Sequence, residues 1–197
     1  MPPRTRLRRL KRFPQQQGHT MPLSRPQPRS LLHLRDIQLR GYERADGLVD
    51  IEARMTDTKP YSWGDQAHSG LNAGEPVHDM WMRLTLDENM RIHACEAAMD
   101  ATPYDICPTA APNFAQLAGL TIGKGFLREA MRRLGGVAGC THLRELLQPL
   151  GTVAFQTMFS VRTRHTATAA ARGLPITPDL INSCVAYDEN GPLIQNS

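Results

Sequence analysis

The sequence is poor in aromatic residues, in long apolar runs and in the short motifs of nucleotide binding. Phenylalanine, tryptophan and tyrosine make up only 6% of its 197 residues. No apolar run approaches the roughly 20 residues that a membrane-spanning helix needs. The chain also has no P-loop, no nucleophile elbow and no dinucleotide fingerprint. We therefore expect neither a membrane partner nor a nucleotide cofactor.

Closely spaced cysteines are missing as well. The four cysteines are Cys95, Cys107, Cys140 and Cys184, and no two of them form a Cys-x-x-Cys unit. The basic N-terminal stretch lacks the apolar core of a secretory signal. Reduced thiols in a cytoplasmic protein are therefore the expectation.

Acidic residues are absent from the first 20 positions, which carry six basic side chains. Without this stretch the formal net charge changes from +4 to −2, because 17 basic and 19 acidic residues remain. A slightly acidic domain does not favour nucleic-acid binding. Met21-Pro22-Leu23-Ser24 reads like a second start. We expect residues 1–20 to be a disordered basic extension and residues 21–197 to form a single domain.

Two periodicities divide this domain. Alternation of apolar and polar residues predicts four consecutive antiparallel strands, over residues 32–42, 48–55, 78–86 and 91–100. A period near 3.6 then predicts three helices, over residues 110–120, over residues 126–134 and from residue 141 onward. Pro149 should kink or divide the last of them. The predicted fold is α+β, with an antiparallel four-stranded meander followed by about three helices in two layers. A further short strand is expected near residues 184–187.

The polar, glycine-rich segment over residues 56–77 interrupts the strand pattern. It contains Lys59, Tyr61 and Trp63. Unstructured connections of this length are usually lids, binding loops or disordered segments. Two aromatic residues in a polar loop favour a lid over an apolar or aromatic ligand.

Histidine, cysteine and aspartate gather at three points of the predicted fold. Three glycines in five residues precede Cys140 and His142 at an expected helix start, where a helix dipole favours a thiolate. The other points are His78 with Asp79, and Asp105 with Cys107. The meander can bring all three to one end of the sheet, where imidazole and thiolate ligands suit zinc or iron. Each residue alone also has a purely structural explanation, as a strand-end pair, a cap or a small buried side chain.

Three segments resemble the bacterial domain-of-unknown-function 2889 family. They are Thr56-Asp57-Thr58-Lys59, Gly74-Glu75-Pro76-Val77-His78-Asp79-Met80-Trp81 and Gly135-Gly136-Val137-Ala138-Gly139-Cys140-Thr141-His142-Leu143. The resemblance extends over residues 21–187. A fainter similarity is to iron–sulfur scaffold proteins of the NifU type. Their three cysteines fall near His78, near Asp105 or Cys107, and on Cys140. An imidazole in place of one thiolate favours a fixed mononuclear metal over cluster transfer.

The resemblance implies a carbon–carbon lyase in the catabolism of lignin-derived aromatic compounds, which releases formaldehyde from an aromatic dimer and leaves a stilbene. On this interpretation one zinc or iron ion is held by four ligands, and the other candidate residues are catalytic or contact a small aromatic substrate. The metal ligands are His78, Cys107, Cys140 and His142, the catalytic residues are Asp79, Asp105 and Tyr61, and the substrate-binding residues are Lys59, Trp63 and Trp81. The chain is also a candidate homo-oligomer. The alternatives are a metal or iron–sulfur carrier and a non-catalytic ligand-binding domain.

Overall fold

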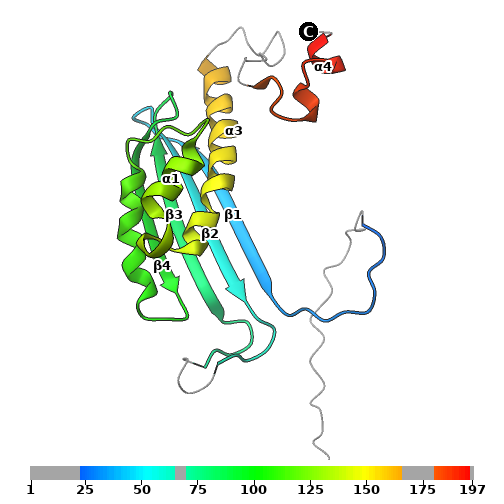
Figure 1. Cartoon of the computed structure of the whole chain (residues 1–197), viewed down its shortest axis with the longest axis vertical. Coiled ribbons are helices and arrows are strands. Elements are labelled where there is room, and N and C mark those ends of the chain that lie inside the picture. Colours follow the sequence, from blue (N-terminus) through cyan, green and yellow to red (C-terminus); the bar gives the residue numbers. More distant parts are fainter. Residues whose placement is uncertain (1–22, 65–69, 166–179, 196–197) are drawn as a thin grey trace, which may run out of the picture. The chain divides into compact units, whose positions relative to one another are not determined.

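A four-stranded antiparallel sheet forms the centre of the computed structural model, which describes residues 23–64, 70–165 and 180–195 (Figure 1). The strands follow one another in the order of the chain: β1 (Leu34–Glu43), β2 (Val49–Thr58), β3 (Pro76–Leu86) and β4 (Ile92–Ala101). The predicted meander is therefore confirmed. The first 31 residues form a separate unit, of which residues 23–31 are described and contain neither helix nor strand. The expected extension over residues 1–20 lies outside the described residues.

The first hairpin turn has the geometry that its Asp-Gly pair predicts. Gly47 has a φ of 84°, which favours glycine, and the Arg44 amide donates to the Leu48 carbonyl at 2.9 Å. β2 then continues to Thr58, three residues beyond the predicted end at Met55. The segment expected as a loop over residues 56–77 is therefore shorter at this end.

The helical half begins with a run of 3-10 helix in place of the predicted α-helix. The elements are η1 (Cys107–Leu117), α1 (Phe126–Leu134), η2 (Gly136–Ala138), α2 (Thr141–Glu145), α3 (Leu147–His165), η4 (Val185–Tyr187) and α4 (Pro192–Gln195). Pro112 lies inside η1, where it cannot donate the hydrogen bond of a regular α-helix. The strand expected near residues 184–187 was wrong, because η4 occupies this position.

Pro149 divides the last predicted helix, as expected. The division falls at Leu146, between α2 and α3, so that Pro149 lies in the first turn of α3. An amide hydrogen is not needed there, because the first-turn amides of a helix have no partner within the helix.

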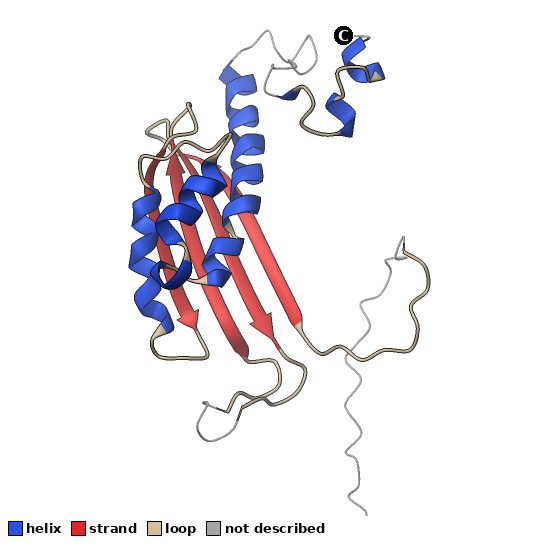
Figure 2. Ribbon diagram, in the orientation of Figure 1, coloured by secondary structure: helices blue, strands red, loops and turns tan. Residues whose placement is uncertain are grey.

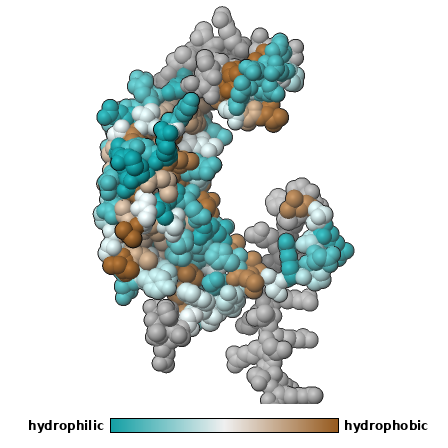
Figure 3. All heavy atoms as spheres, viewed as in Figure 1, coloured by the Kyte–Doolittle hydropathy of each residue, from teal (hydrophilic) through white to brown (hydrophobic). Residues whose placement is uncertain are grey.

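Helices η1, α1, α2 and α3 cover one face of the sheet and complete the two-layer α+β arrangement (Figure 2). The inward side chains of β2 and β3 alternate with outward ones and are almost fully buried: Val49, Ile51, Ala53, Met55, Met80, Met82, Leu84 and Leu86. They pack against apolar helix residues such as Phe114, Leu143 and Leu150. On the face seen in Figure 3, apolar residues form small separate groups among hydrophilic ones. None of the helices in the described residues is long and apolar enough to cross a membrane.

Candidate active site

One end of the inward sheet face carries charged and imidazole groups in place of apolar side chains. Asp57 continues the inward series of β2 beyond Met55, and its register partner in β3 is His78. On the other side, Asp57 pairs with Arg35 in β1. Because directly opposed residues in an antiparallel sheet point to the same face, Arg35, Asp57 and His78 form a row beneath the helices.

Asp57 is the organising residue of this row. Its side chain is only 1% exposed, and its two oxygens accept four hydrogen bonds. Arg35 donates from Nε to Oδ1 and from Nη2 to Oδ2, both at 2.7 Å. The rings of His33 and His78 each lie 3.0 Å away, from Nε2 to Oδ1 and from Nδ1 to Oδ2 respectively. These four bonds use the four lone-pair sites of a carboxylate.

Asp57 is held in its ionised form. Burial by itself raises the pKa of this carboxyl, but the hydrogen bond and charge of Arg35, with the nearby His33 and His78, bring the pKa down to about 2. An ionised carboxylate can only accept hydrogen bonds. His78 must therefore carry its proton on Nδ1, which leaves the lone pair of Nε2 available for chemistry when the ring is neutral.

His142 completes the group from the helical layer. Its ring centroid lies 3.8 Å from that of His78, with the two planes inclined by 35°. Burial lowers the pKa of His78, and the charge of His142 lowers it further, against the opposing effect of Asp57. Burial also lowers the pKa of His142, followed by the charge of Arg35. Two adjacent imidazoles with lowered pKa values favour the neutral rings that bind metals or accept protons.

The glycine-rich segment before α2 brings His142 to this position. A Cβ on Gly139 would lie 2.4 Å from the Leu134 carbonyl oxygen, so only glycine fits at this close approach to the end of α1. Cys140 is the N-cap residue of α2, and its Sγ lies 3.8 Å from Nδ1 of His142. Glu145, one turn further, accepts a hydrogen bond from Nη1 of Arg35. Arg35 therefore joins β1 to β2 and to α2.

The structure does not bring Asp79 and Trp81 to this group. Asp79 follows His78 in β3, and successive strand residues point to opposite faces of the sheet. Asp79 forms a bidentate ion pair with Arg54, at 2.9 and 2.7 Å. The guanidinium of Arg54 lies 4.6 Å above the Trp81 ring, and Trp81 donates to Asp100 at 2.9 Å. This second cluster lies on the face that the helices leave uncovered.

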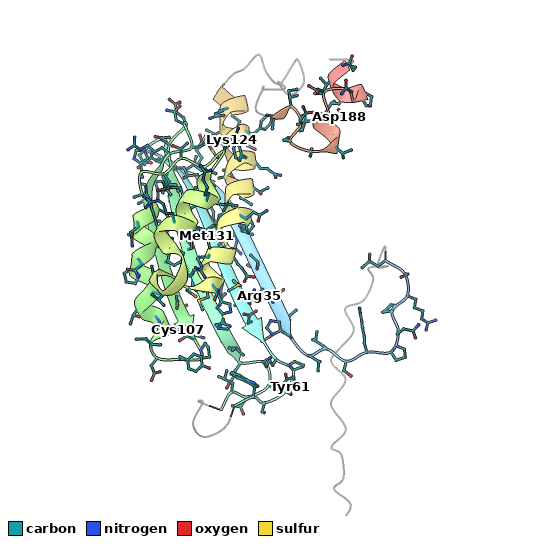
Figure 4. All side chains as sticks on the ribbon, viewed as in Figure 1. Arg35, Tyr61, Cys107, Lys124, Met131 and Asp188 are labelled. Atoms are coloured by element: carbon teal, nitrogen blue, oxygen red, sulfur yellow. The ribbon has the colours of Figure 1, made fainter. Side chains whose placement is uncertain are left out.

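Asp105 and Cys107 also stay apart from the two histidines. Asp105 is exposed, and the half-buried Cys107 begins η1 beside β4. Figure 4 shows Cys107 and Arg35 toward the same end of the sheet but at its two opposite edges, beside β4 and β1 respectively. Of the remaining thiols, Cys95 is buried in the core, and this burial, followed by the charge of Glu96, raises its pKa to about 12. Cys95 is therefore an unreactive structural residue.

The loop residues Lys59, Tyr61 and Trp63 do come together. The Lys59 ammonium lies 5.6 Å from the Tyr61 ring centroid and 5.8 Å from that of Trp63, within the range of a cation–π interaction. The loop leaves the sheet directly after Asp57 and Thr58, and Tyr61 is seen at this end in Figure 4. Tyr61 and Trp63 remain 38% and 37% exposed. Residues 65–69 of the expected lid lie outside the described residues.

Two surface hollows are separate from this site. One, of about 680 Å³, borders β4 and η1 and includes Trp81 and Cys95 in its lining. The other, of about 740 Å³, lies among the β3–β4 turn, α1 and α3. Neither lining includes Asp57, His78 or His142, so the hollows and the histidine pair are different features of the surface.

Sequence reasoning identified the histidines but missed Asp57 and Arg35. The sequence prediction places Asp57 in the loop, whereas in the structure it continues the odd-numbered apolar series of β2 by one more step. The alternation of β2 places the Asp57 carboxylate on the buried face of the strand. A carboxylate at such a position requires a charged partner, and this could have identified Asp57 as a site residue. Arg35 gave no comparable signal, since only two side chains of β1 are even partly buried.

The residues present fit a metal ion in part. Among the described residues, Asp57, His78 and His142 are a group whose ligand atoms lie within 4.8 Å of one another. Asp57 has no free lone pair, however, so it orients His78 and is not a ligand itself. Cys140 is not a member of this group, but it lies beside His142 and is a further candidate ligand. Its 3.8 Å separation from Nδ1 of His142 is close to the roughly 3.6 Å expected between sulfur and nitrogen ligands of tetrahedral zinc.

Comparison with known proteins gives one family. The family model described as protein of unknown function (DUF2889) matches residues 33–156, which is more than half of the chain. No curated protein and no solved structure matches the chain. The similarity to iron–sulfur scaffold proteins stays a prediction. The matched region contains the whole sheet, all the residues of the Asp57 group and the loop aromatics. This protein is a member of the DUF2889 family.

Proposed function

We propose that this protein is a small-molecule enzyme, a carbon–carbon lyase that releases formaldehyde from a lignin-derived aromatic dimer. The observation that carries the enzymatic part is the half-buried pair of His78 and His142 over the ionised Asp57. A carboxylate that fixes the proton on Nδ1 of a histidine leaves Nε2 as a positioned base. The reaction class comes from the family resemblance.

The reaction needs a base and a group that stabilises a departing oxygen. Removal of the proton from the hydroxymethyl oxygen lets that carbon leave as formaldehyde, while the electrons of the broken carbon–carbon bond form the alkene. The neighbouring hydroxyl takes up the removed proton and departs as water. Nε2 of His78 is the base in this proposal. Asp79 and Asp105 are less suitable, since Asp79 is paired with Arg54, and Asp105 is exposed and does not belong to the group of Asp57, His78 and His142.

One zinc or iron ion is part of the proposal. His142 and Cys140 would hold it, while His78, whose Nδ1 is bonded to Asp57, stays free to act as the base. Such an ion supplies a Lewis acid for oxygen. A cluster carrier is less well supported, because iron–sulfur clusters are held mainly by thiolates, and a single cysteine accompanies these histidines.

The loop supplies the aromatic contacts. Lys59 holds Tyr61 and Trp63 near one another at the end of the sheet where the histidines lie. Their half-exposed rings offer stacking surfaces for an aromatic substrate, and the ammonium of Lys59 suits a phenolate oxygen. A purely ligand-binding domain would use these same contacts, so turnover separates the two functions.

The test is turnover of a 1,2-diarylpropane-1,3-diol, followed by the absorbance of the stilbene and by trapping of formaldehyde. We expect activity in the full chain, a loss of about 100-fold or more in His78→Gln, and near-normal activity in His93→Gln, which changes an exposed histidine on β4. Absence of turnover, or full activity in His78→Gln, would overturn the proposal. Elemental analysis of the protein and of Cys140→Ser tests the metal separately.

A further inference from the structure

β1 presents an unpaired strand edge. It is ten residues long, and β2 is the only strand that pairs with it in the described parts of the chain. The bond from the Arg44 amide to the Leu48 carbonyl fixes the alternation of hydrogen bonds in this hairpin. Even-numbered residues of β1 therefore direct their amides and carbonyls toward β2, and odd-numbered residues direct theirs toward the open edge.

The sequence of β1 lacks several of the features that protect an edge strand. Natural edge strands are commonly blocked by proline, lysine or a bulge. β1 contains no proline and no lysine, and its register with β2 runs without a bulge. The opposite edge differs, because the start of β4 is bonded to the segment before α1, through Ile92 and Leu120 at 2.8 Å. Leu34, Ile37 and Tyr42 of β1 are also 40–44% exposed.

We propose that the open edge of β1 pairs with β1 of a second copy of this chain, antiparallel and with the two-fold axis at Gln38. In this register Asp36 lies opposite Arg40 of the partner subunit, and the same pair recurs on the other side of the axis. Leu34 lies opposite Tyr42 of the partner subunit on the same face. On the helix-bearing face, Ile37 lies opposite Leu39 of the partner subunit.

The sequence of β1 is complementary to itself in this register, which favours a second copy of the chain as the partner of the open edge. Two opposite-charge pairs and four apolar pairs arise from six residues within the nine-residue stretch over residues 34–42, and each such cross-strand pair is stabilising. In this register, odd-numbered residues of the two strands lie opposite one another. Their amides and carbonyls, which point toward the open edge, can therefore form the hydrogen bonds between the strands. A shift by two residues places Asp36 opposite Tyr42 or Gln38 of the partner subunit, and these charge pairs are lost. This pairing goes beyond the proposed function and does not depend on it.

Charge reversal tests the register. We expect the full chain to be a dimer in sedimentation velocity. Asp36→Arg and Arg40→Asp should each raise the dissociation constant by about tenfold, because each places like charges opposite one another twice. The double variant Asp36→Arg with Arg40→Asp should restore the dimer. Glu88→Arg, an exposed reversal in the β3–β4 turn, is the control and should leave the dimer unchanged.

Crosslinking gives an independent measurement that does not rely on charge. Gln38 is the only β1 residue that meets itself across the axis, so Gln38→Cys in a Cys184→Ser background should form an intersubunit disulfide under mild oxidation. Arg40→Cys in the same background faces a different residue and should not. A monomeric wild-type chain, a dimer indifferent to both charge reversals, or equal crosslinking at positions 38 and 40 would overturn the proposal.

Discussion

At the scale of single residues, the fold depends on one carboxylate. Asp57 accepts four hydrogen bonds from three side chains, and it is the point at which β1, β2 and β3 are joined by charge. A buried carboxylate is costly unless such partners compensate for its lost hydration. The same four bonds fix the position of His78 and bring Arg35 toward Glu145.

The variant Asp57→Asn should lower the free energy of unfolding by about 3 kcal/mol, because it removes the buried partner of Arg35 and leaves only the exposed Glu145 as its charged partner. Urea denaturation measures this. Glu96→Gln, which neutralises an exposed partner of Arg83, should change the stability by less than about 1 kcal/mol. Equal effects of the two substitutions would contradict the role given to Asp57.

The free energy of unfolding should depend on pH in the acid range through the ionisation of Asp57. Its pKa of about 2 in the folded protein lies below the ordinary value of 3.8. The stability that it contributes is therefore fully present above the ordinary pKa and is lost as the pH falls through about 2. Asp57→Asn should lack this part of the pH dependence. An unchanged acid profile in the variant would show that other carboxylates are responsible.

The two histidines predict a second pH effect, of the same sign but in another range. Burial lowers the pKa of both rings below the ordinary 6.5, so the unfolded chain binds protons more readily than the folded one. Stability should fall as the pH is lowered through this region. His142→Gln should reduce the difference in unfolding free energy between about pH 7.5 and about pH 5. His93→Gln is the control, and the prediction fails if both substitutions act alike.

The site was predictable only in part, for a reason that lies in strand geometry. His78 and His142 were both expected as site residues, because their surroundings in the sequence indicated a strand start and a helix start. Asp79 was assigned to the same site, yet neighbouring residues of a strand point to opposite faces. A difference of one position along the strand therefore decides whether a side chain lies beneath the helices or on the uncovered face.

At the scale of elements, periodicity predicted most of the fold. The four strands and α1 lie near their expected ranges, because alternation and a 3.6-residue period reflect one buried face in each. η1 departs from the α-helical expectation at its prolines. The relation between β1 and α3 was not predictable, since it depends on a contact between residues far apart in the sequence.

The contact between β1 and α3 at Gly41 and Thr157 provides a test of packing. A Cβ on Gly41 would lie 1.9 Å from Oγ1 of Thr157 in α3 and 2.8 Å from its Cβ. Gly41→Ala should therefore cost about 1–3 kcal/mol of unfolding free energy through overpacking. Thr157→Ala in the same chain should recover part of this loss. Gly123→Ala, where an added Cβ meets no atom within 4 Å, should remain within about 0.5 kcal/mol of the wild type. A Gly41→Ala protein as stable as the wild type would rule out the close approach.

At the scale of the whole molecule, the sheet separates two kinds of chemistry. The helix-bearing face contains the apolar core and, at one end, the Asp57 group. The uncovered face carries ion pairs such as Arg83 with Glu52 and the Arg54–Trp81 stack. In the part of the chain that the structure describes, this covered end combines buried charge with imidazole and thiol groups. Metal binding there should therefore change the stability of the entire fold.

Zinc should stabilise the folded protein, because a ligand that binds only the native state shifts the unfolding equilibrium. At a free concentration about 100 times its dissociation constant, the gain is about 2.7 kcal/mol. Thermal denaturation with zinc and with a chelator measures it. Cys140→Ala should lose most of the gain, whereas Cys184→Ala, at an exposed thiol, should keep it. Identical midpoints with zinc and chelator in the wild type would contradict the metal site.

The bond between Arg35 and Glu145 spans 110 positions of the chain. During synthesis, all four strands leave the ribosome well before α2, and a meander of neighbouring hairpins can begin to pair from local contacts alone. The histidine pair cannot exist at that stage, because His142 has not yet been added. The site is thus one of the last parts of the protein to assemble, and a chain interrupted before α2 would contain a sheet without a reaction centre.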